Sequence, residues 1–140
     1  MSYLEKLIYF AQNQIPSCSA AQMIGYRVLE AEKGRVVVGL EKTENFHNPI
    51  GTVHGGIISL IADAAMGYAF STTLAEDEIS TTVELKINFL KAPTSQALRA
   101  ESKIIKRGST LGLLECSVID EEGKLIAYAT STCIVLKKKQ

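Results

Sequence analysis

The segment from Gly55 to Phe70, GGIISLIADAAMGYAF, is the feature that most constrains how this chain can fold. It has the length of a helix and is apolar on nearly every side, so a helix formed by it must be buried on most of its faces. Its many small residues allow neighbouring backbones to come close. The segment is too short to span a bilayer and contains one acid, Asp63, so it predicts a buried central helix and not a membrane helix.

Strands are predicted before and after this helix along the sequence. Before it, residues 23–43 read as a hairpin with its turn at 32–34. After it, three strands are predicted over 97–107, 110–120 and 125–136, separated by turn-forming residues.

The strand that directly follows the helix has the clearest alternation. Val83, Leu85, Ile87 and Phe89 alternate with polar residues until Pro93 breaks the pattern. This is the period of a strand with one buried face, so we expect these four apolar side chains to point to the core.

The first residues of the chain predict a short amphipathic helix. Over 2–14, Leu4, Leu7, Ile8 and Ala11 fall on one helical face. With the strands, this gives an α+β fold in which a curved antiparallel sheet of about six strands wraps around one long central helix.

A chain of 140 residues fits one domain, over 1–140. We expect 1–22 to hold the N-terminal helix and its connection, and 23–136 to hold the core. The net charge is zero, with 15 basic and 15 acidic residues, which favours neither a nucleic-acid nor a membrane partner.

The cysteines indicate a reducing compartment. Cys18, Cys116 and Cys133 are odd in number and widely spaced, so neither a zinc site nor a disulfide framework is predicted. No secretory signal is evident at the start of the chain. We therefore expect a cytoplasmic protein without a metal.

The residues before the central helix form a candidate binding site. Asn48 and Gly51 precede His54-Gly55-Gly56 at the expected helix start. The first N–H groups of a helix lack intrahelical partners and favour negative charge, as an oxyanion site requires. Alternatively, the two glycines only permit a tight junction between loop and helix.

Asp63 is the second candidate. A buried carboxylate must be hydrogen-bonded, paired or shifted in pKa. Neighbouring hydroxyls or backbone donors could satisfy it, or it could face water at a groove. The functional alternative is a nucleophile or general base in an apolar pocket.

Helix geometry separates these candidates. His54 and Asp63 are nine residues apart, which places them on opposite faces and ~13 Å apart along the axis. If they share a site, Asp63 comes from another subunit. This predicts two composite sites at a two-fold dimer interface.

The segment NPIGTVHGGIISLIADAAMGYA resembles the hotdog-fold acyl-CoA thioesterases of the PaaI-like group, over about 23–136. In that family an Asn is followed by a Gly, by His-Gly-Gly, and by an Asp seven residues after the last glycine. The matching residues here are Asn48, Gly51, His54, Gly55, Gly56 and Asp63. The resemblance implies a hotdog fold and hydrolysis of an acyl- or aryl-acyl-CoA, without a metal or cofactor.

The resemblance also implies roles for individual residues. Gly55 would donate its N–H to the thioester carbonyl, and Asp63 would attack that carbonyl or activate water. Asn48 would orient the water or the carboxylate. His54 would order the thioester end of the substrate, with Gly56 beside it.

A hydroxyl residue at the start of the strand after the helix is the weaker part of the match. Thr82 occupies that position, but strand alternation places it on the face opposite Val83 and Leu85, so Thr81 could serve instead.

Basic residues at strand ends could bind the anionic part of coenzyme A. The alternative is that these surface charges cluster by chance and bind nothing. These residues are Lys91, Lys106 and Arg107.

Two other functions share the fold that the resemblance implies. One is a hydratase or dehydratase of acyl thioesters, and the other is an acyl-CoA-binding sensor without catalysis. The acyl preference, aromatic or medium-chain, stays open. Whether Asp63 attacks the carbonyl directly or activates water also stays open. A dimer is expected, and exposed apolar strand faces favour its pairing into a tetramer.

Overall fold

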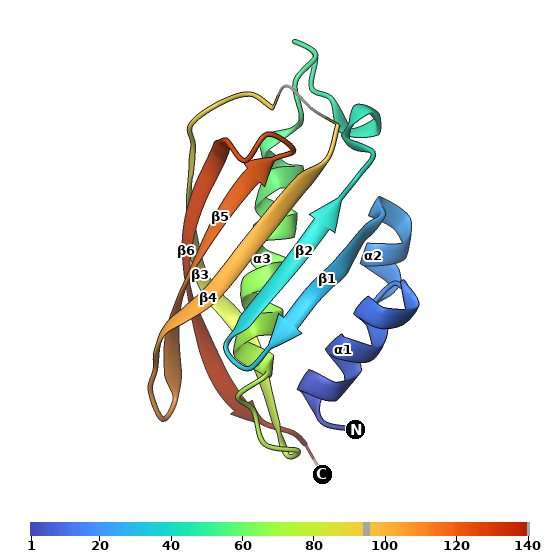
Figure 1. Cartoon of the computed structure of the whole chain (residues 1–140). Helices are drawn as coiled ribbons and strands as arrows, with labels where there is room; N and C mark the ends of the chain where they lie inside the picture. The colour runs from blue at the N-terminus through green and yellow to red at the C-terminus, as the bar shows by residue number, and fades with distance from the viewer. Residues whose placement is uncertain (94–95, 140) are drawn as a thin grey trace.

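The computed structural model describes residues 1–93 and 96–139. The predicted order of one helix, two strands, a long helix and four strands is confirmed (Figure 1), and the short helices α2 and η1 were not expected. The elements are α1 (Tyr3–Asn13), α2 (Ser19–Ile24), β1 (Tyr26–Glu32), β2 (Arg35–Leu40), the 3-10 helix η1 (Thr43–Phe46), α3 (Gly55–Ser71), β3 (Glu78–Phe89), β4 (Leu98–Arg107), β5 (Leu111–Asp120) and β6 (Leu125–Lys137).

The strands form one six-stranded antiparallel sheet in the order β1-β2-β4-β5-β6-β3. The sheet curves around α3, which lies against its concave side, while α1 and α2 lie beside β1 (Figure 1). The chain leaves α3 and enters β3 at one edge of the sheet, so β3 pairs only with β6 among the described residues. No helix in that part of the chain is long and apolar enough to cross a membrane.

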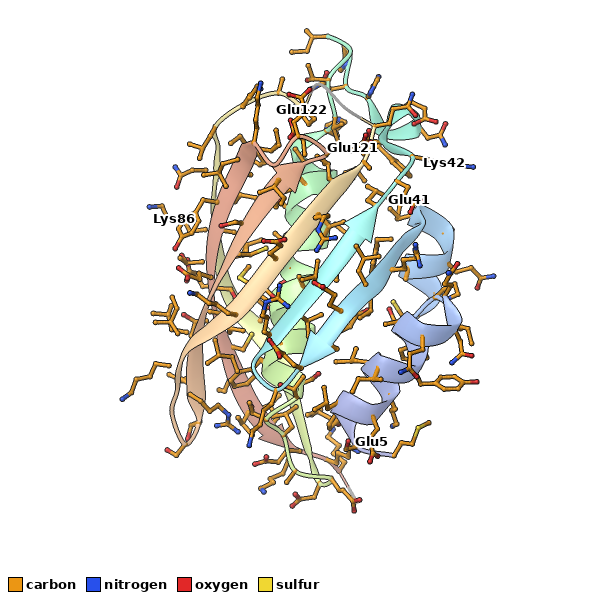
Figure 2. The ribbon with its side chains drawn as sticks, in the orientation of Figure 1. Glu5, Glu41, Lys42, Lys86, Glu121 and Glu122 are labelled. Carbon is orange, nitrogen blue, oxygen red and sulfur yellow. The ribbon has the colours of Figure 1, made fainter. Side chains whose placement is uncertain are left out.

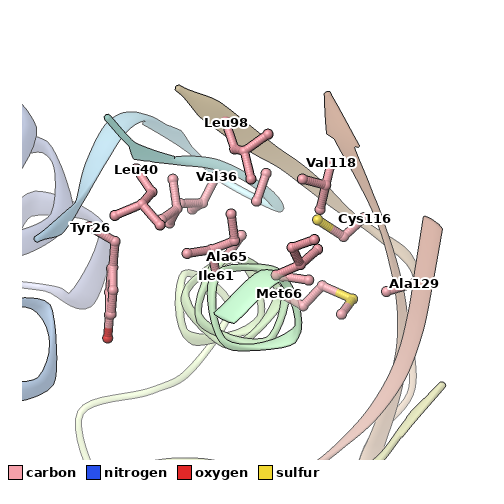
Figure 3. Packing of buried hydrophobic residues seen from close by; sticks show 14 of the residues in the cluster. Tyr26, Val36, Leu40, Ile61, Ala65, Met66, Leu98, Cys116, Val118 and Ala129 are labelled. Atoms are coloured by element: carbon pink, nitrogen blue, oxygen red, sulfur yellow. The ribbon is translucent and has the colours of Figure 1, made fainter. Parts of the chain in front are cut away.

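The apolar character of α3 is explained by its contact with the sheet. Ile61, Ala65 and Met66 of α3 are fully buried and face the inner side of the sheet, where Val36 and Val118 lie (Figure 3). Burying a side chain of this size contributes roughly 1.5–3 kcal/mol. The predicted buried central helix is thus confirmed.

A buried serine adds a polar link between sheet and helix. The Ser102 hydroxyl of β4 lies 2.8 Å from the carbonyl oxygens of both Val36 and Ala65, so β4, β2 and α3 meet at one hydroxyl. Buried hydroxyls need such partners, because an unpaired one costs about 1–3 kcal/mol.

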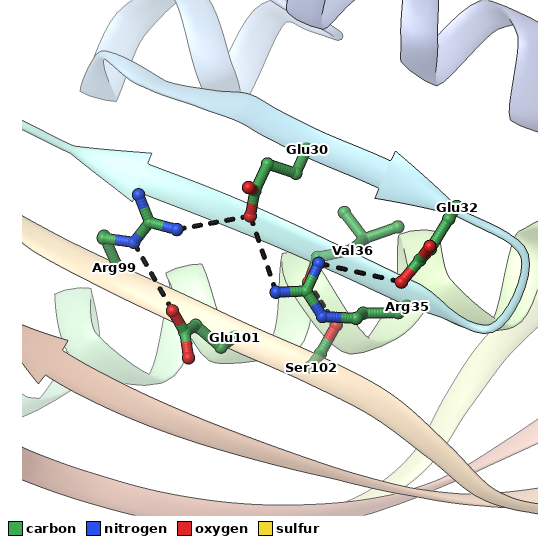
Figure 4. Close-up of polar contacts among 7 residues, drawn as sticks. All are labelled: Glu30, Glu32, Arg35, Val36, Arg99, Glu101 and Ser102. Carbon is green, nitrogen blue, oxygen red and sulfur yellow. Dashed lines mark hydrogen bonds and ion pairs between the residues drawn. The ribbon is translucent and has the colours of Figure 1, made fainter.

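The outer face of the sheet carries charged side chains. The Glu30 carboxylate forms ion pairs with both Arg35 and Arg99 (Figure 4). Arg35 also pairs with Glu32, and Arg99 also pairs with Glu101. The pairs join β1, β2 and β4, but each is solvent-exposed, so each contributes little, about 0–1 kcal/mol.

The N-terminal helix is confirmed, and its start is well defined. The Ser2 hydroxyl accepts from the Glu5 N–H, and the Glu5 carboxylate accepts from the Ser2 N–H, a capping box. Leu7 is its buried residue, with Phe10 and Ala11 packed against the core.

A β-bulge interrupts β3. Thr82 lies opposite Cys133 and Glu84 lies opposite Thr132, so Val83 is an extra residue without a partner on β6. Because the bulge adds one residue to β3, the alternation shifts by one position there. Odd-numbered residues face inward after the bulge, and even-numbered residues face inward before it. Thr82 therefore points to α3.

The predicted alternation is wrong at Val83, which is 58% exposed. It holds for Leu85 and Ile87, which pack against the core. Lys86, between them, projects outward (Figure 2). Phe89 is 53% exposed, and its ring lies beside the start of α3.

Candidate active site

Asp63 and Thr82 meet in the structure. Asp63 is half-buried in the middle of α3, and the Thr82 hydroxyl donates to its Oδ1 at 2.8 Å. Within the described residues, its Oδ2 accepts no hydrogen bond. One oxygen is therefore fixed by the protein, and the other is open to a substrate or water. Thr82, and not Thr81, supplies the hydroxyl, because of the bulge.

A hollow of about 520 Å³ opens beside Asp63. Its walls come from α1, α3 and β3, and much of its lining is apolar, including Leu7, Phe10, Leu60 and Ile79. Thr81 also lines it, at an exposed position. An apolar chamber next to a half-free carboxylate suits an acyl group whose carbonyl is attacked at one end.

Hydroxyl and thiol groups gather on one side of this hollow. Ser17 Oγ lies 2.6 Å from the Tyr68 hydroxyl, and Cys18 Sγ lies 3.4 Å from the Tyr26 hydroxyl and 3.8 Å from that of Tyr68. Burial raises the pKa of Tyr26 and of Tyr68, so both phenols stay protonated at neutral pH. Sequence reasoning missed this group, because Tyr68 lies far along the chain from Ser17, Cys18 and Tyr26 and the four form no motif.

Cys133 lies on β6 directly opposite Thr82 and also lines the hollow. Burial raises the pKa of its thiol, hydrogen bonding with Thr82 and Ser131 opposes this rise, and the charge of Asp63 adds to it. The thiol is therefore neutral at physiological pH and is not poised as a nucleophile.

The start of α3 presents free donors. Ile57 and Ile58 donate their N–H groups to the His54 carbonyl oxygen, whereas those of Gly55 and Gly56 have no acceptor in the described chain. Apart from its chain neighbours and the nearby backbone of α3, no described atom lies within 4 Å of where a Gly56 Cβ would be, so side-chain packing among these residues does not require that glycine. The N–H groups can therefore serve a ligand.

Gly55 lines a separate hollow of about 430 Å³ together with Asn48, Phe89 and Lys91. A Cβ at Gly55 would come within 3.0 Å of the Phe89 ring. The ring thus lies close to the first turn of α3, and a side chain at Gly55 would have to displace it.

The Asn48 amide shapes the loop before α3. Its Oδ1 accepts from the N–H groups of Ile50 and Thr52, both at 3.1 Å, and its Nδ2 donates to the Thr52 hydroxyl at 2.8 Å. Only one N–H hydrogen of the amide stays unused within the described residues. This turn-forming role was not anticipated, although Asn before Pro-x-Gly is a turn signal.

His54 is exposed and lines a different hollow of about 380 Å³ with Gly56 and Phe46. Its backbone N–H donates to the Phe46 carbonyl oxygen at 2.8 Å. The imidazole is not directed toward Asp63 of its own chain, because the two residues line different hollows.

The three predicted basic residues do not come together within one chain. Lys91 lies near the start of α3, whereas Lys106 and Arg107 end β4 near the opposite end of that helix. Arg107 donates to the Thr73 hydroxyl at 2.9 Å and lies over the Phe70 ring. Its guanidinium is therefore already engaged.

Gly55 and Asp63 are also separated. Eight residues of helix correspond to ~12 Å along the axis, and the two residues line different hollows, as the sequence geometry requires. In 1–93 and 96–139, no three His, Cys, Asp or Glu side chains are grouped so that they could hold a metal ion.

Comparison with known proteins identifies the family. A family model described as the thioesterase superfamily matches residues 50–127, more than half of the chain. A 1,4-dihydroxy-2-naphthoyl-CoA hydrolase of Listeria monocytogenes is 31% identical over 119 residues, which cover 85% of this chain and 97% of that protein.

Solved structures share the fold. A thioesterase family protein of Silicibacter pomeroyi is 26% identical with a TM-score of 0.84, covering 97% of this chain and 99% of that one. The PaaI protein of E. coli, from a phenylacetic acid degradation operon, has a TM-score of 0.83 at 19% identity, with 99% of each chain covered. The resemblance seen in the sequence is thus confirmed: the chain belongs to the thioesterase superfamily and is a thioester hydrolase with the hotdog fold.

Proposed function

We propose that this protein hydrolyses acyl-CoA thioesters at composite sites, each built from Asp63 of one protomer and the Gly55 N–H of its partner. The observation that carries the proposal is the Asp63 carboxylate, which is held at one oxygen by Thr82 and open at the other beside an apolar hollow. The Listeria relative is named for a CoA thioester, which favours the same class of leaving group here.

The reaction adds one water to the thioester. In one route, the open oxygen of Asp63 removes a proton from water as the water attacks the carbonyl carbon. In the other, Asp63 attacks that carbon itself to form an anhydride, and water then attacks the acyl carbon of the anhydride and releases the Asp63 carboxylate. Either way the C–S bond breaks, the acid keeps the water oxygen, and the coenzyme A sulfur leaves as thiolate and takes up a proton. No metal or cofactor is needed for these steps.

The Gly55 N–H stabilises the carbonyl oxygen as it becomes negative. This donor has no acceptor among residues 1–93 and 96–139 and lies at the positive end of α3. Removing one such donor costs on the order of 100-fold in rate. Asn48 contributes its one free N–H, and His54 and Gly56 border the thioester.

A two-fold dimer would bring the two halves of the site together. β3 is a twelve-residue edge strand, and the adjacent face of α3 at Gly56, Leu60, Asp63 and Gly67 is left partly exposed. Long exposed edges favour pairing with another strand. Antiparallel pairing of two β3 edges would set the start of each α3 toward the middle of its partner.

The substrate would be divided between the hollows. The acyl group would enter the hollow beside Asp63, and the anionic part of coenzyme A would lie near Lys91 of the partner's helix start. Lys106 is exposed and is a second contact, whereas the guanidinium of Arg107 is already bonded within its own chain. We place the protein in the cytoplasm, since its three cysteines are free thiols.

Two such dimers would pair through the outer face of the sheet. Ile105, Leu111 and Leu113 are exposed there, each more than 40%. Apolar side chains grouped on one face favour a further interface. Light scattering after gel filtration would give the mass of a tetramer.

The proposal is tested with a panel of acyl-CoA substrates by following release of free thiol. We expect turnover by the wild type and a loss of at least about 100-fold in Asp63→Asn, with an unchanged melting temperature. A change in enoyl absorbance without thiol release would indicate a hydratase. Tight acyl-CoA binding without turnover would indicate a sensor. Full activity in Asp63→Asn would show that the Asp63 carboxylate has no catalytic role.

A further inference from the structure

We propose that α1 is the end wall of the acyl-binding hollow and that Tyr3 limits how long an acyl group this enzyme can accept. The inference rests on the proposed function, because it takes the hollow beside Asp63 as the acyl site. The helix α1 contains no residue of the motif between Asn48 and Asp63. Its position beside the hollow therefore needs another explanation.

The N-terminal segment is tied across the hollow at two places. The Tyr3 hydroxyl donates to the Glu78 carbonyl oxygen at 2.7 Å, which links the start of α1 to the start of β3. Ser17, after α1, lies 2.6 Å from the Tyr68 hydroxyl of α3. Both ties span elements that line the same hollow. The Tyr3–Glu78 hydrogen bond closes the end of the hollow that lies beside the C-terminal part of α3.

Tyr3 is held firmly in this position. The ammonium groups of Lys6 and Lys138 lie 5.7 and 5.6 Å from the centre of its ring. Cations at this distance from an aromatic face are attracted to it. Leu7, one turn further along α1, is buried. The ring thus forms a fixed stop and not a freely moving side chain.

The length of the hollow follows from two independent walls. Along α3, Asp63 and Ser71 are eight residues apart, or ~12 Å. Along β3, Thr82 and Glu78 are four residues apart, or ~13 Å. The two values agree, so the closed end lies ~12–13 Å from Asp63 and Thr82, where the proposed function places the reacting carbonyl.

This length sets the substrate class. Three bonds of an extended chain span ~3.8 Å, so ~12 Å holds about nine or ten bonds. The hollow therefore accepts straight acyl groups of up to about ten carbons, or acyl groups with a single aromatic ring. Longer chains meet the Tyr3 ring and the Tyr3–Glu78 bond.

The test is a series of straight-chain acyl-CoA substrates from acetyl to hexadecanoyl. We expect kcat/KM of the wild type to fall about tenfold or more between decanoyl and tetradecanoyl. Tyr3→Ala should restore most of that loss. Tyr3→Phe, which lacks only the hydroxyl, should restore part of it. Tyr9→Phe is the matched control, since Tyr9 lies on the exposed side of α1, and should behave as the wild type.

Binding separates the inference from the proposed function. In the Asp63→Asn background, tetradecanoyl-CoA should bind about tenfold or more weaker than decanoyl-CoA, and Tyr3→Ala should remove that difference. If the length profile of Tyr3→Ala matches that of the wild type in both assays, the inference is wrong, whereas octanoyl-CoA turnover that needs Asp63 would still support the function. If no acyl-CoA is hydrolysed, the function is wrong, and the binding series alone decides the length limit.

Discussion

At the scale of single residues, the Thr82 hydroxyl fixes one oxygen of Asp63 at 2.8 Å and leaves the other open. Thr82→Val keeps the shape of the side chain but removes this bond. A hydrogen bond to a charged group contributes roughly 1.5–3 kcal/mol, so kcat should fall roughly tenfold to hundredfold. Thr82→Ser keeps the hydroxyl and should stay near wild-type activity. Equal rates in Thr82→Val and Thr82→Ser would mean that the bond has no catalytic role.

The Gly55 N–H can be removed without breaking the helix. Gly55 is the first residue of α3, where proline is tolerated, and His54 before it has the extended backbone that a following proline requires. We expect Gly55→Pro to lower kcat on the order of 100-fold. Gly55→Ala also displaces the Phe89 ring but keeps the N–H, so it should lose much less. Similar losses in both variants would point to the added side chain as the cause.

The three cysteines should differ sharply in reactivity. Burial acts to raise the pKa of the exposed Cys18 thiol, but hydrogen bonds, first that from Tyr26, lower it overall. Burial raises the pKa of Cys116 to about 12 and also raises that of Cys133. A lower pKa gives more thiolate at a given pH, so iodoacetamide at pH 7 should label Cys18 first. Peptide mass mapping checks this, and early labelling of Cys116 would contradict the fold.

Residue positions around Asp63 were only partly predictable. Asp63 and Gly55 stand in a recognisable pattern, and helix geometry alone separates them. Thr82 was placed on the wrong face because the bulge at Val83 adds a residue to β3 without any marker in the sequence. Asn48 was expected to orient the water or the carboxylate, and most of its amide is used by its own loop, which leaves one N–H for that role.

At the scale of elements, two glycines that look alike in the sequence should respond in opposite ways to alanine. A Cβ on Gly112 of β5 would come within 2.3 Å of the buried Phe70 ring, so Gly112→Ala should lower stability by about 1–3 kcal/mol. Gly67 in α3 has open space beside it, so Gly67→Ala should raise stability by up to ~1 kcal/mol. Urea unfolding measures both. Stabilisation by Gly112→Ala would contradict the packing of α3 against β5.

The elements themselves were predicted well because their signals are local. The apolar run of α3 spans more than ten residues, and the alternation in β3 covers seven, from Val83 to Phe89. The helix α2 was missed because its six residues are too few to show a period. The order of the strands in the sheet also has no local signal, since it depends on the path of the chain around α3.

At the scale of the whole molecule, Asp63 and Gly55, the two halves of the proposed site, line different hollows of the described chain. The hollow beside Asp63 draws its walls from residues as distant as Tyr3 and Cys133, which no sequence motif links. The same tertiary arrangement leaves the β3 edge and one face of α3 open. Each proposed site would therefore need a second copy of the chain to complete it.

Complementation between two inactive variants tests this claim most directly. Asp63→Asn and Gly55→Pro are unfolded together in equal amounts and refolded, so that the chains assort at random. If each site takes Asp63 from one protomer and Gly55 from its partner, half of the sites receive an intact Asp63, and half of those an intact Gly55. The mixture should then regain about a quarter of wild-type thioesterase activity. If both groups act within one chain, no intact site forms, and a mixture as inactive as its two parents would contradict the composite site.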